Sequence, residues 1–192
     1  MKKILSTVLV ASSLLFYSTP SFALLSVSVG MPIGQSITGK RAGKDYGNAT
    51  DKTGGYFLGA SFASIGIGID SYITKFKTDG TDGSWPAEFD AGLKTNMTNI
   101  FYQLPIPVLN LIIGLGTGTT EYDCSIPYCS KKYDKGSATQ WYTSIGIPLI
   151  PLFDIHLSYR SITSKNIIKN KMEGTKDDNS GSVTGLGISF NF

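Results

Sequence analysis

The residues that could do chemistry gather in one short stretch. Its alternate positions carry Asp154, His156, Ser158 and Arg160, and His156 is the chain's single histidine. In an extended strand these four side chains point to the same face. A histidine near a serine offers the base and the nucleophile of a hydrolase, provided that a third group orients the base. The same residue types also build structural polar networks, and we favour that interpretation, with Asp70 as a further member.

Two cysteines, Cys124 and Cys129, bracket a short segment of the chain. In an oxidising compartment such a pair is expected to form a disulfide that staples a loop. A metal pair is the less favoured alternative, because a metal site needs further ligands and neither a histidine nor a third cysteine is near. We therefore expect a loop disulfide, no metal and no cofactor.

The composition narrows the class of protein. The chain has 192 residues, which fits one domain, and 22 of them are glycine. Charged residues make up 16% of the chain, whereas an average soluble protein has about 25%. The net charge of +3 is too small to indicate a nucleic-acid partner. The chain also lacks a P-loop, a Rossmann glycine pattern and a zinc-protease motif.

The N-terminus has the pattern of a secretory signal peptide. Two lysines precede an apolar run over 4–17, and 21–23 form a small-x-small cleavage site. A membrane anchor is the less favoured alternative, because a spanning helix needs about 20 apolar residues. We predict a signal peptide over 1–23 and a single mature domain over 24–192.

Apolar and polar residues alternate along eight segments of the mature chain, as in strands with one apolar face. These segments lie at 24–34, 54–63, 65–77, 91–104, 109–116, 139–147, 153–160 and 185–192. In the fourth segment neither face is cleanly apolar, so the facing of Met97, Asn99 and Phe101 stays open. No later apolar run is long enough for a spanning helix. Any membrane crossing is therefore expected to be made by strands.

The connections between these segments alternate strictly in length. Very short ones lie at 64, 105–107 and 148–151, and long polar ones lie at 35–53, 78–90, 121–138 and 164–180. Short turns at one end and long loops at the other are typical of outer-membrane β-barrels. A sheet is stable in hydrocarbon only when it closes, because an open edge would leave backbone groups without partners. We therefore predict an all-β fold, an eight-stranded antiparallel up-and-down transmembrane β-barrel.

In such a barrel the apolar faces point outward to lipid, and the faces rich in Ser, Gly and Asn point into the lumen. Aromatic residues near the segment ends would form the interfacial girdles; they are Tyr56, Phe62, Tyr102, Trp141, Phe153, Tyr159, Phe190 and Phe192. A secreted soluble β-sandwich or lipocalin-like barrel, with its apolar face inside, is the alternative. We favour the membrane barrel because a face of Gly and Ser makes a poor solvated surface.

The last segment places Leu186, Ile188, Phe190 and Phe192 on one face and ends the chain on phenylalanine. It looks like the C-terminal signal that the barrel-assembly machinery of bacterial outer membranes recognises. The mature chain resembles the small eight-stranded barrels: the OmpA-like membrane domain, OmpX, the opacity proteins and the OmpW family. The resemblance implies a bacterial outer-membrane location, with lipid and lipopolysaccharide as partners. The functions of these families range from adhesion and host-cell contact to envelope integrity and passage of small hydrophobic solutes.

The pair His156 and Ser158 also resembles the His-x-Ser motif of lipid A deacylases, which are eight-stranded outer-membrane barrels too. Three departures weaken this resemblance. In that family the pair faces lipid, whereas here His156 and Ser158 alternate with the apolar residues and so are expected to face the lumen. Tyr159 stands where an Asn usually follows the serine. The carboxylate would have to come from Glu173, in a long loop.

We therefore expect a non-enzymatic outer-membrane barrel that exposes four extracellular loops for surface interaction, adhesion or envelope integrity. The loops would bind an extracellular ligand, and their basic residues offer positive charge to lipopolysaccharide or host polyanions; these are Lys40, Arg41, Lys44, Lys131, Lys132, Lys135, Lys165, Lys169, Lys171 and Lys176. The first alternative is a small-solute pore, favoured by the small residues of the lumen face. The second is a lipid A deacylase-like enzyme.

Overall fold

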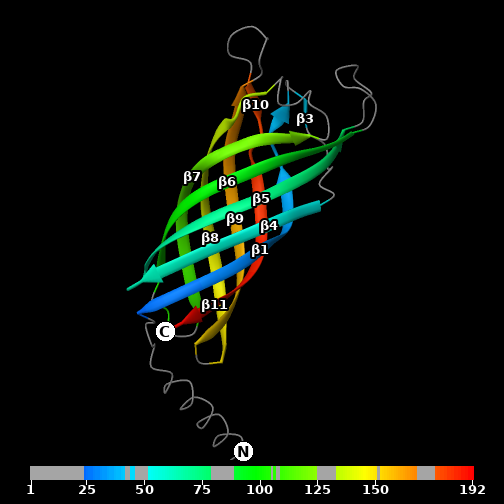
Figure 1. Ribbon diagram of the computed structural model, residues 1–192. Helices are drawn as coiled ribbons and strands as arrows, with labels where there is room; N and C mark the ends of the chain where they lie inside the picture. Colours follow the sequence, from blue (N-terminus) through cyan, green and yellow to red (C-terminus); the bar gives the residue numbers. More distant parts are fainter. Residues whose placement is uncertain are drawn as a thin grey trace, which may run out of the picture.

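The fold is known from a computed structural model, which describes residues 24–41, 44–45, 52–78, 89–104, 106, 109–124, 133–150, 152–167 and 176–192. The predicted signal peptide, 1–23, lies outside the described residues and stays a prediction. The search for a helix that could span a membrane, made over the described residues, found none. The described chain is a tilted cylinder of strands, with the C-terminus at the end opposite to β3 and β10 (Figure 1).

Eight strands form the wall of the cylinder. They are β1 (Leu25–Ile37), β4 (Lys52–Phe62), β5 (Ile65–Thr78), β6 (Phe89–Leu104), β7 (Asn110–Cys124), β8 (Gly136–Ile150), β9 (Phe153–Ile167) and β11 (Gly181–Asn191). Each is antiparallel to the next along the chain. The first and last strands also pair, and Phe192 N donates to the Leu25 carbonyl at 2.7 Å. The predicted closed eight-stranded barrel is thereby confirmed.

Three short strands lie near the end of the wall that carries the long connections. The pair β2 (Lys40–Arg41) and β3 (Lys44–Asp45) forms a small hairpin between β1 and β4. The strand β10 (Lys176–Asp178) pairs with the end of β9 and so extends the wall beyond β11. At the opposite end, Ala63 and Ser64 make the tight turn between β4 and β5, both with positive φ, as type I′ hairpin turns require.

Several strands run further into the long connections than the sequence predicts. The strand β7 continues to Cys124 and β8 begins at Gly136, inside the interval predicted as loop, and β9 continues to Ile167. The outward positions there include Glu121, Asp123, Ser137 and Lys165, so the apolar alternation ends before the backbone pairing does. The predicted boundaries at 121–138 and 164–180 are therefore wrong in extent, because pairing of backbone groups does not depend on apolar side chains.

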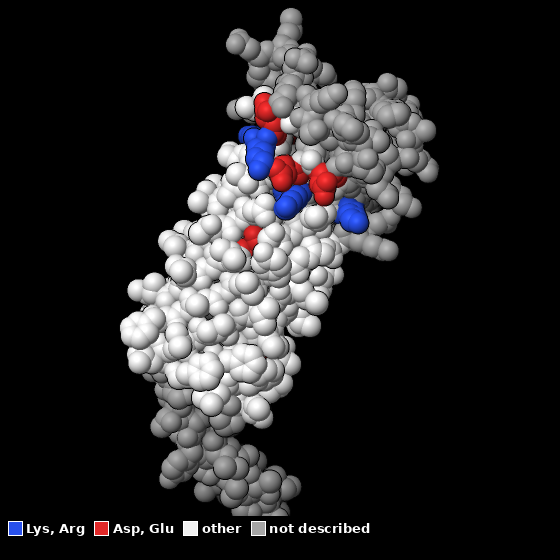
Figure 2. Space-filling view, in the orientation of Figure 1, with Lys and Arg blue, Asp and Glu red and all other residues white. Residues whose placement is uncertain are grey.

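The apolar face of every wall strand points outward. Ile67 is 67% exposed, Leu115 61% and Leu157 58%. The soluble alternative, with its apolar face inside, is therefore wrong. Along β1 the apolar positions run from Leu25 to Ile33, about 26 Å at 3.3 Å per residue, or about 20 Å along the axis of a barrel whose strands tilt by about 40°. On the face shown in Figure 2 the charged side chains gather toward one end, and the rest of the wall carries none.

The lumen is filled by large and small residues that alternate from strand to strand. One cross-strand row of the register joins Gly66, Phe101, Gly114, Tyr142 and Arg160. A Cβ at Gly66 would overlap the Phe101 ring, and one at Gly114 would overlap the Tyr142 ring. The large side chains therefore lie across the lumen above neighbouring glycines.

In the structure, the residues of β6 whose facing the sequence left open take clear positions. Met97, Asn99 and Phe101 are buried and face the lumen, whereas Ile100 and Tyr102 are exposed on the outer face. The pattern was hard to read because both faces of this strand carry large apolar residues.

Candidate functional site

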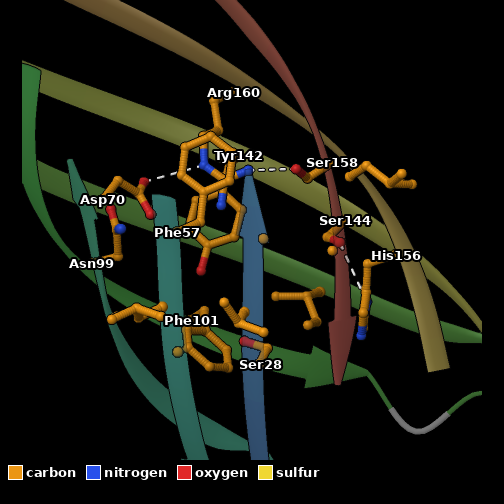
Figure 3. Close-up of a pocket in the computed structure, with 18 of the residues that line it drawn as sticks. Ser28, Phe57, Asp70, Asn99, Phe101, Tyr142, Ser144, His156, Ser158 and Arg160 are labelled. Atoms are coloured by element: carbon orange, nitrogen blue, oxygen red, sulfur yellow. Dashed lines mark hydrogen bonds and ion pairs between the residues drawn. The ribbon is translucent and has the colours of Figure 1, made fainter. Parts of the chain in front are cut away.

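The centre of the lumen is occupied by Arg160, which β9 directs inward. Its Nε donates to Asp70 Oδ2 at 3.1 Å, and its Nη1 donates to Ser158 Oγ at 2.5 Å (Figure 3). The side chains of the ion pair are 7% and 2% exposed. Because a buried charge is costly unless it is paired and hydrogen-bonded, these contacts hold the guanidinium in one place.

Two aromatic rings enclose the guanidinium. The Arg160 Cζ lies 3.6 Å from the centroid of the Phe57 ring and 4.8 Å from that of the Tyr142 ring. Both separations are within the range of cation–π attraction. The ring of Phe57 also meets that of Tyr72 edge-on, with centroids 5.9 Å apart. The arginine and the rings together form a plug across the middle of the barrel.

Amide side chains complete the plug on the Asp70 side. Gln140 Nε2 donates to Asp70 Oδ2 at 2.6 Å and lies 2.5 Å from Asn99 Oδ1. Asp70 is 3% exposed, Asn99 1% and Gln140 4%. The contacts link β5, β6, β8 and β9 across the lumen, so the polar groups brace the wall from inside.

A second polar group lies nearer the end with the tight turns. His156 Nε2 is 2.6 Å from Ser189 Oγ, and His156 Nδ1 is 3.5 Å from Ser144 Oγ. Asp154 Oδ2 accepts from Asn110 Nδ2 at 3.1 Å and from Asn191 Nδ2 at 2.8 Å. These contacts join β7, β8, β9 and β11.

The arrangement does not join His156 and Ser158 as base and nucleophile. The Ser158 hydroxyl donates to the Gly185 carbonyl at 3.3 Å and accepts from Arg160, while the imidazole is engaged by Ser189 and Ser144. Both residues are buried in the lumen. Acyl chains lie in the membrane outside the wall, so this pair is not where a lipid-cleaving pair would have to be.

A third polar group lies at the end with the long connections. Asn166 Oδ1 accepts from Thr120 Oγ1 and from Asn179 Nδ2, each at 2.8 Å, and Tyr122 donates its hydroxyl to Asn179 at 2.9 Å. Asn166 Nδ2 donates to the Asp134 carbonyl at 2.9 Å. The sequence placed these residues in or beside loops, so this group was not predicted.

A small cavity lies between these groups. A cavity of about 60 Å³, lined in part by Ser28, Phe101 and Ser144, lies beside the plug (Figure 3). At 10–15 Å³ for each water, that is room for about four to six molecules.

The structure places Asp70, Asp154, His156, Ser158 and Arg160 in the lumen, in two separate groups. The sequence missed the residues that contact them, namely Phe57, Asn99, Gln140 and Tyr142. For Phe57, Gln140 and Tyr142 the available signal was parity, because each lies on the same strand face as glycine or serine positions. The lumen face of β6 has no glycine or serine, so Asn99 had no such signal. Within the described residues no three His, Cys, Asp or Glu side chains come together as a metal site.

The other predicted features fall partly outside the described residues. Cys129 is not described, so its disulfide to Cys124 stays a prediction. On β11, Leu186 and Phe190 are exposed on the outer face, and Phe192 follows them at the end of the chain, also exposed. Their part in recognition by the assembly machinery stays a prediction too.

Comparison with known proteins identifies the fold. No protein-family model matches the chain, and no curated protein sequence matches it significantly. Among solved structures, Neisserial surface protein A (NspA) is similar with a TM-score of 0.56 and 10% sequence identity, covering 88% of this chain and 96% of NspA. This protein has the fold of the small eight-stranded outer-membrane β-barrels.

A second solved barrel is similar to the same extent. The outer membrane protein OprG from Pseudomonas aeruginosa matches with a TM-score of 0.52 and 11% identity, covering 88% of this chain and 95% of OprG. At these identities the likeness concerns the small-barrel fold, and the lumen residues must be judged from their own geometry.

Proposed function

We propose that this chain is a closed, non-conducting barrel of the bacterial outer membrane that holds its four long connections at the cell surface. The outward apolar face supports the membrane location, because such a surface would aggregate in water. The role is non-enzymatic, and it consists of surface interaction, adhesion or envelope integrity through those connections. Lipid and lipopolysaccharide surround the wall, and an extracellular ligand binds the loops.

The observation that carries the proposal is the plug. Arg160, Asp70, Phe57 and Tyr142 lie across the middle of the lumen, and the group around Asn166 lies nearer one end. A lumen sealed by packed rings and buried hydrogen bonds serves the stability of the wall. The outer surface and the loops are then the parts of the barrel that contact other molecules.

The test is conductance of the refolded mature chain in planar bilayers. We expect no reproducible current steps from protein that migrates as a folded barrel. The variant Arg160→Ser/Tyr142→Ala removes the centre of the plug, and current steps from it show that the assay detects an open lumen. Reproducible steps from the unaltered barrel would overturn the proposal and favour the small-solute pore.

The hydrolase alternative has its own test. The purified barrel is incubated with lipid A, and its acyl chains are followed by mass spectrometry. We expect no loss of acyl chains. Deacylation that disappears in both His156→Ala and Ser158→Ala would overturn the non-enzymatic role.

A further inference from the structure

A single charged side chain, Asp154, lies in the stretches of wall that flank the tight turns. These stretches are 24–34, 57–69, 97–116, 142–159 and 185–192, and they hold no other Asp, Glu, Lys or Arg. The Asp154 side chain faces the lumen and is 6% exposed. Further along the same strand face, Arg160 is already paired with Asp70. A buried carboxylate is stable only when its charge is compensated.

Two asparagines reach this carboxylate from other strands. Asn110 Nδ2 donates to Asp154 Oδ2 at 3.1 Å, and Asn191 Nδ2 donates to the same oxygen at 2.8 Å. Asn110 comes from β7 and crosses Gly146 on β8, where a Cβ would meet the Asn110 Cβ at 3.0 Å. Asn191 comes from the end of β11. The strands β7, β9 and β11 therefore bring one carboxylate and two amides together at this end of the lumen.

The carbonyl oxygens of both amides are buried as well. Within the described part of the chain, neither Asn110 Oδ1 nor Asn191 Oδ1 accepts a hydrogen bond. A buried polar atom without a partner is costly and uncommon in native proteins. Here two such atoms belong to the side chains that contact one carboxylate. A group that satisfies all three side chains must be positively charged or must donate hydrogen bonds.

His156, two positions further along β9, does not supply that charge. Its Nε2 is 2.6 Å from Ser189 Oγ and its Nδ1 is 3.5 Å from Ser144 Oγ, so both ring nitrogens are engaged by serines. Ser26, the buried register partner of Asn191, adds only a hydroxyl. The ligand atoms available around Asp154 are therefore oxygens, which suit hard cations.

We propose that Asp154, Asn110 and Asn191 bind one monovalent cation, sodium, at the end of the lumen near the tight turns. One carboxylate balances one positive charge, whereas a divalent cation would leave a buried charge without compensation. The two amide oxygens are further ligands of the ion. Asn110 and Asn191 are only half-buried, so the ion reaches them from the aqueous side.

The bound ion has a structural consequence. It joins β7, β9 and β11 through ligands that are far apart in the chain, and it binds the folded barrel alone, because the unfolded chain does not bring these residues together. Sodium should therefore raise the stability of the barrel. This site is separate from the long connections and does not depend on the role proposed for them.

The experiment compares thermal unfolding of the mature barrel in detergent micelles in NaCl and in choline chloride of equal ionic strength. Choline is too large to be held by the three side chains. We expect the midpoint to be about 2–4 °C higher in NaCl, the shift for a ligand at several times its dissociation constant. The shift should level off as sodium is raised. Equal midpoints in the two salts would overturn the inference, since water would then satisfy the amide oxygens.

Two variants assign the shift to the carboxylate. Asp154→Asn removes the charge and keeps the size of the side chain, and we expect it to abolish the sodium shift. The matched control is Asp123→Asn, at the other end of the barrel, where the carboxylate is exposed; it should keep the shift. A sodium shift that survives in Asp154→Asn would mean a general salt effect and would overturn the site.

A third variant tests the match of charge. Asn110→Asp places a second carboxylate beside Asp154, and we expect this variant to be stabilised more by CaCl₂ than by NaCl at equal ionic strength, because two carboxylates suit a divalent ion. The unaltered barrel should show the reverse order. A larger shift with calcium than with sodium in the unaltered barrel would overturn the assignment to a monovalent cation.

A direct measurement locates the ion even if Asp154→Asn fails to fold. Crystals of the unaltered barrel are grown with thallium(I), a heavy substitute for alkali cations, in place of sodium. We expect an anomalous scattering peak in contact with Asp154, Asn110 and Asn191. The absence of a peak beside Asp154 would overturn the inference.

Discussion

At the scale of single residues, Arg160 holds the interior together by contacts of three kinds. It pairs with Asp70, donates to Ser158, and lies between the rings of Phe57 and Tyr142. Asp70, Phe57 and Tyr142 lie on three different strands of the wall, whereas Ser158 lies on the same strand as Arg160. A single side chain therefore couples β4, β5, β8 and β9.

Removing one partner of this ion pair should be far more damaging than removing both. Arg160→Ala leaves the Asp70 carboxylate buried without its cation, and we expect a loss of about 3–5 kcal/mol in the free energy of unfolding. The double variant Asp70→Leu/Arg160→Met should lose less, since no buried charge remains. Guanidinium unfolding in detergent micelles measures both. If Arg160→Ala lowers the free energy of unfolding by less than about 1 kcal/mol, this ion pair does not stabilise the barrel as described.

At the scale of the strand, the two ends of β9 lie at different depths in the membrane. The outer face should therefore tolerate a charged side chain at one end and not at the other. Leu157 and Thr163 are both outward and exposed, but Leu157 lies among the apolar positions and Thr163 lies beyond them, toward the long connections. We expect Leu157→Lys to cost about 2–4 kcal/mol and Thr163→Lys about 0–1 kcal/mol, the values for lysine at the midplane and near the interface of a bilayer. Unfolding from liposomes measures the difference. Equal costs would contradict the assigned membrane depth.

The strands also depend on glycine where large lumen rings cross their neighbours. Gly114→Ala places a methyl group against the Tyr142 ring, and Gly66→Ala places one against the Phe101 ring. We expect each to lose about 1–3 kcal/mol through overpacking. Gly54→Ala is the control, because a Cβ there meets nothing within 4 Å. Thermal unfolding of the three variants side by side tests whether the lumen is packed as described.

At the scale of the whole molecule, closure is the property on which the membrane location depends. The strand β11 pairs with both β9 and β1, so it is the piece that joins the two ends of the sheet. Without it, both neighbours would expose backbone groups, which cannot be tolerated in hydrocarbon.

Closure predicts heat-modifiable migration on gels. Unheated mature protein in SDS should run at a different position from boiled protein, because the closed sheet resists the detergent until it is heated. A chain that ends at Ser180 lacks β11 and should run at one position under both conditions. A full-length chain that also runs at one position, and is soluble without detergent, would contradict the barrel architecture.

Strand parity and turn spacing were readable from the sequence because they are local. The alternation around His156, the glycines of β11 and the short connection at Ser64 predicted the barrel and the lumen side of Asp154, His156, Ser158 and Arg160. The ends of β7 and β9 were not readable, because backbone pairing continues past the point where the apolar pattern stops.

The sequence by itself thus determined the class of fold, the number of wall strands and which face of most strands meets lipid, since period and loop length are properties of neighbouring residues. Only the tertiary structure decided that Asp70 meets Arg160, that His156 turns to Ser189 instead of Ser158, and that Phe57 and Tyr142 enclose the guanidinium. Those contacts join residues far apart in the chain, and they depend on which lumen-facing side chains meet once the sheet has closed into a barrel.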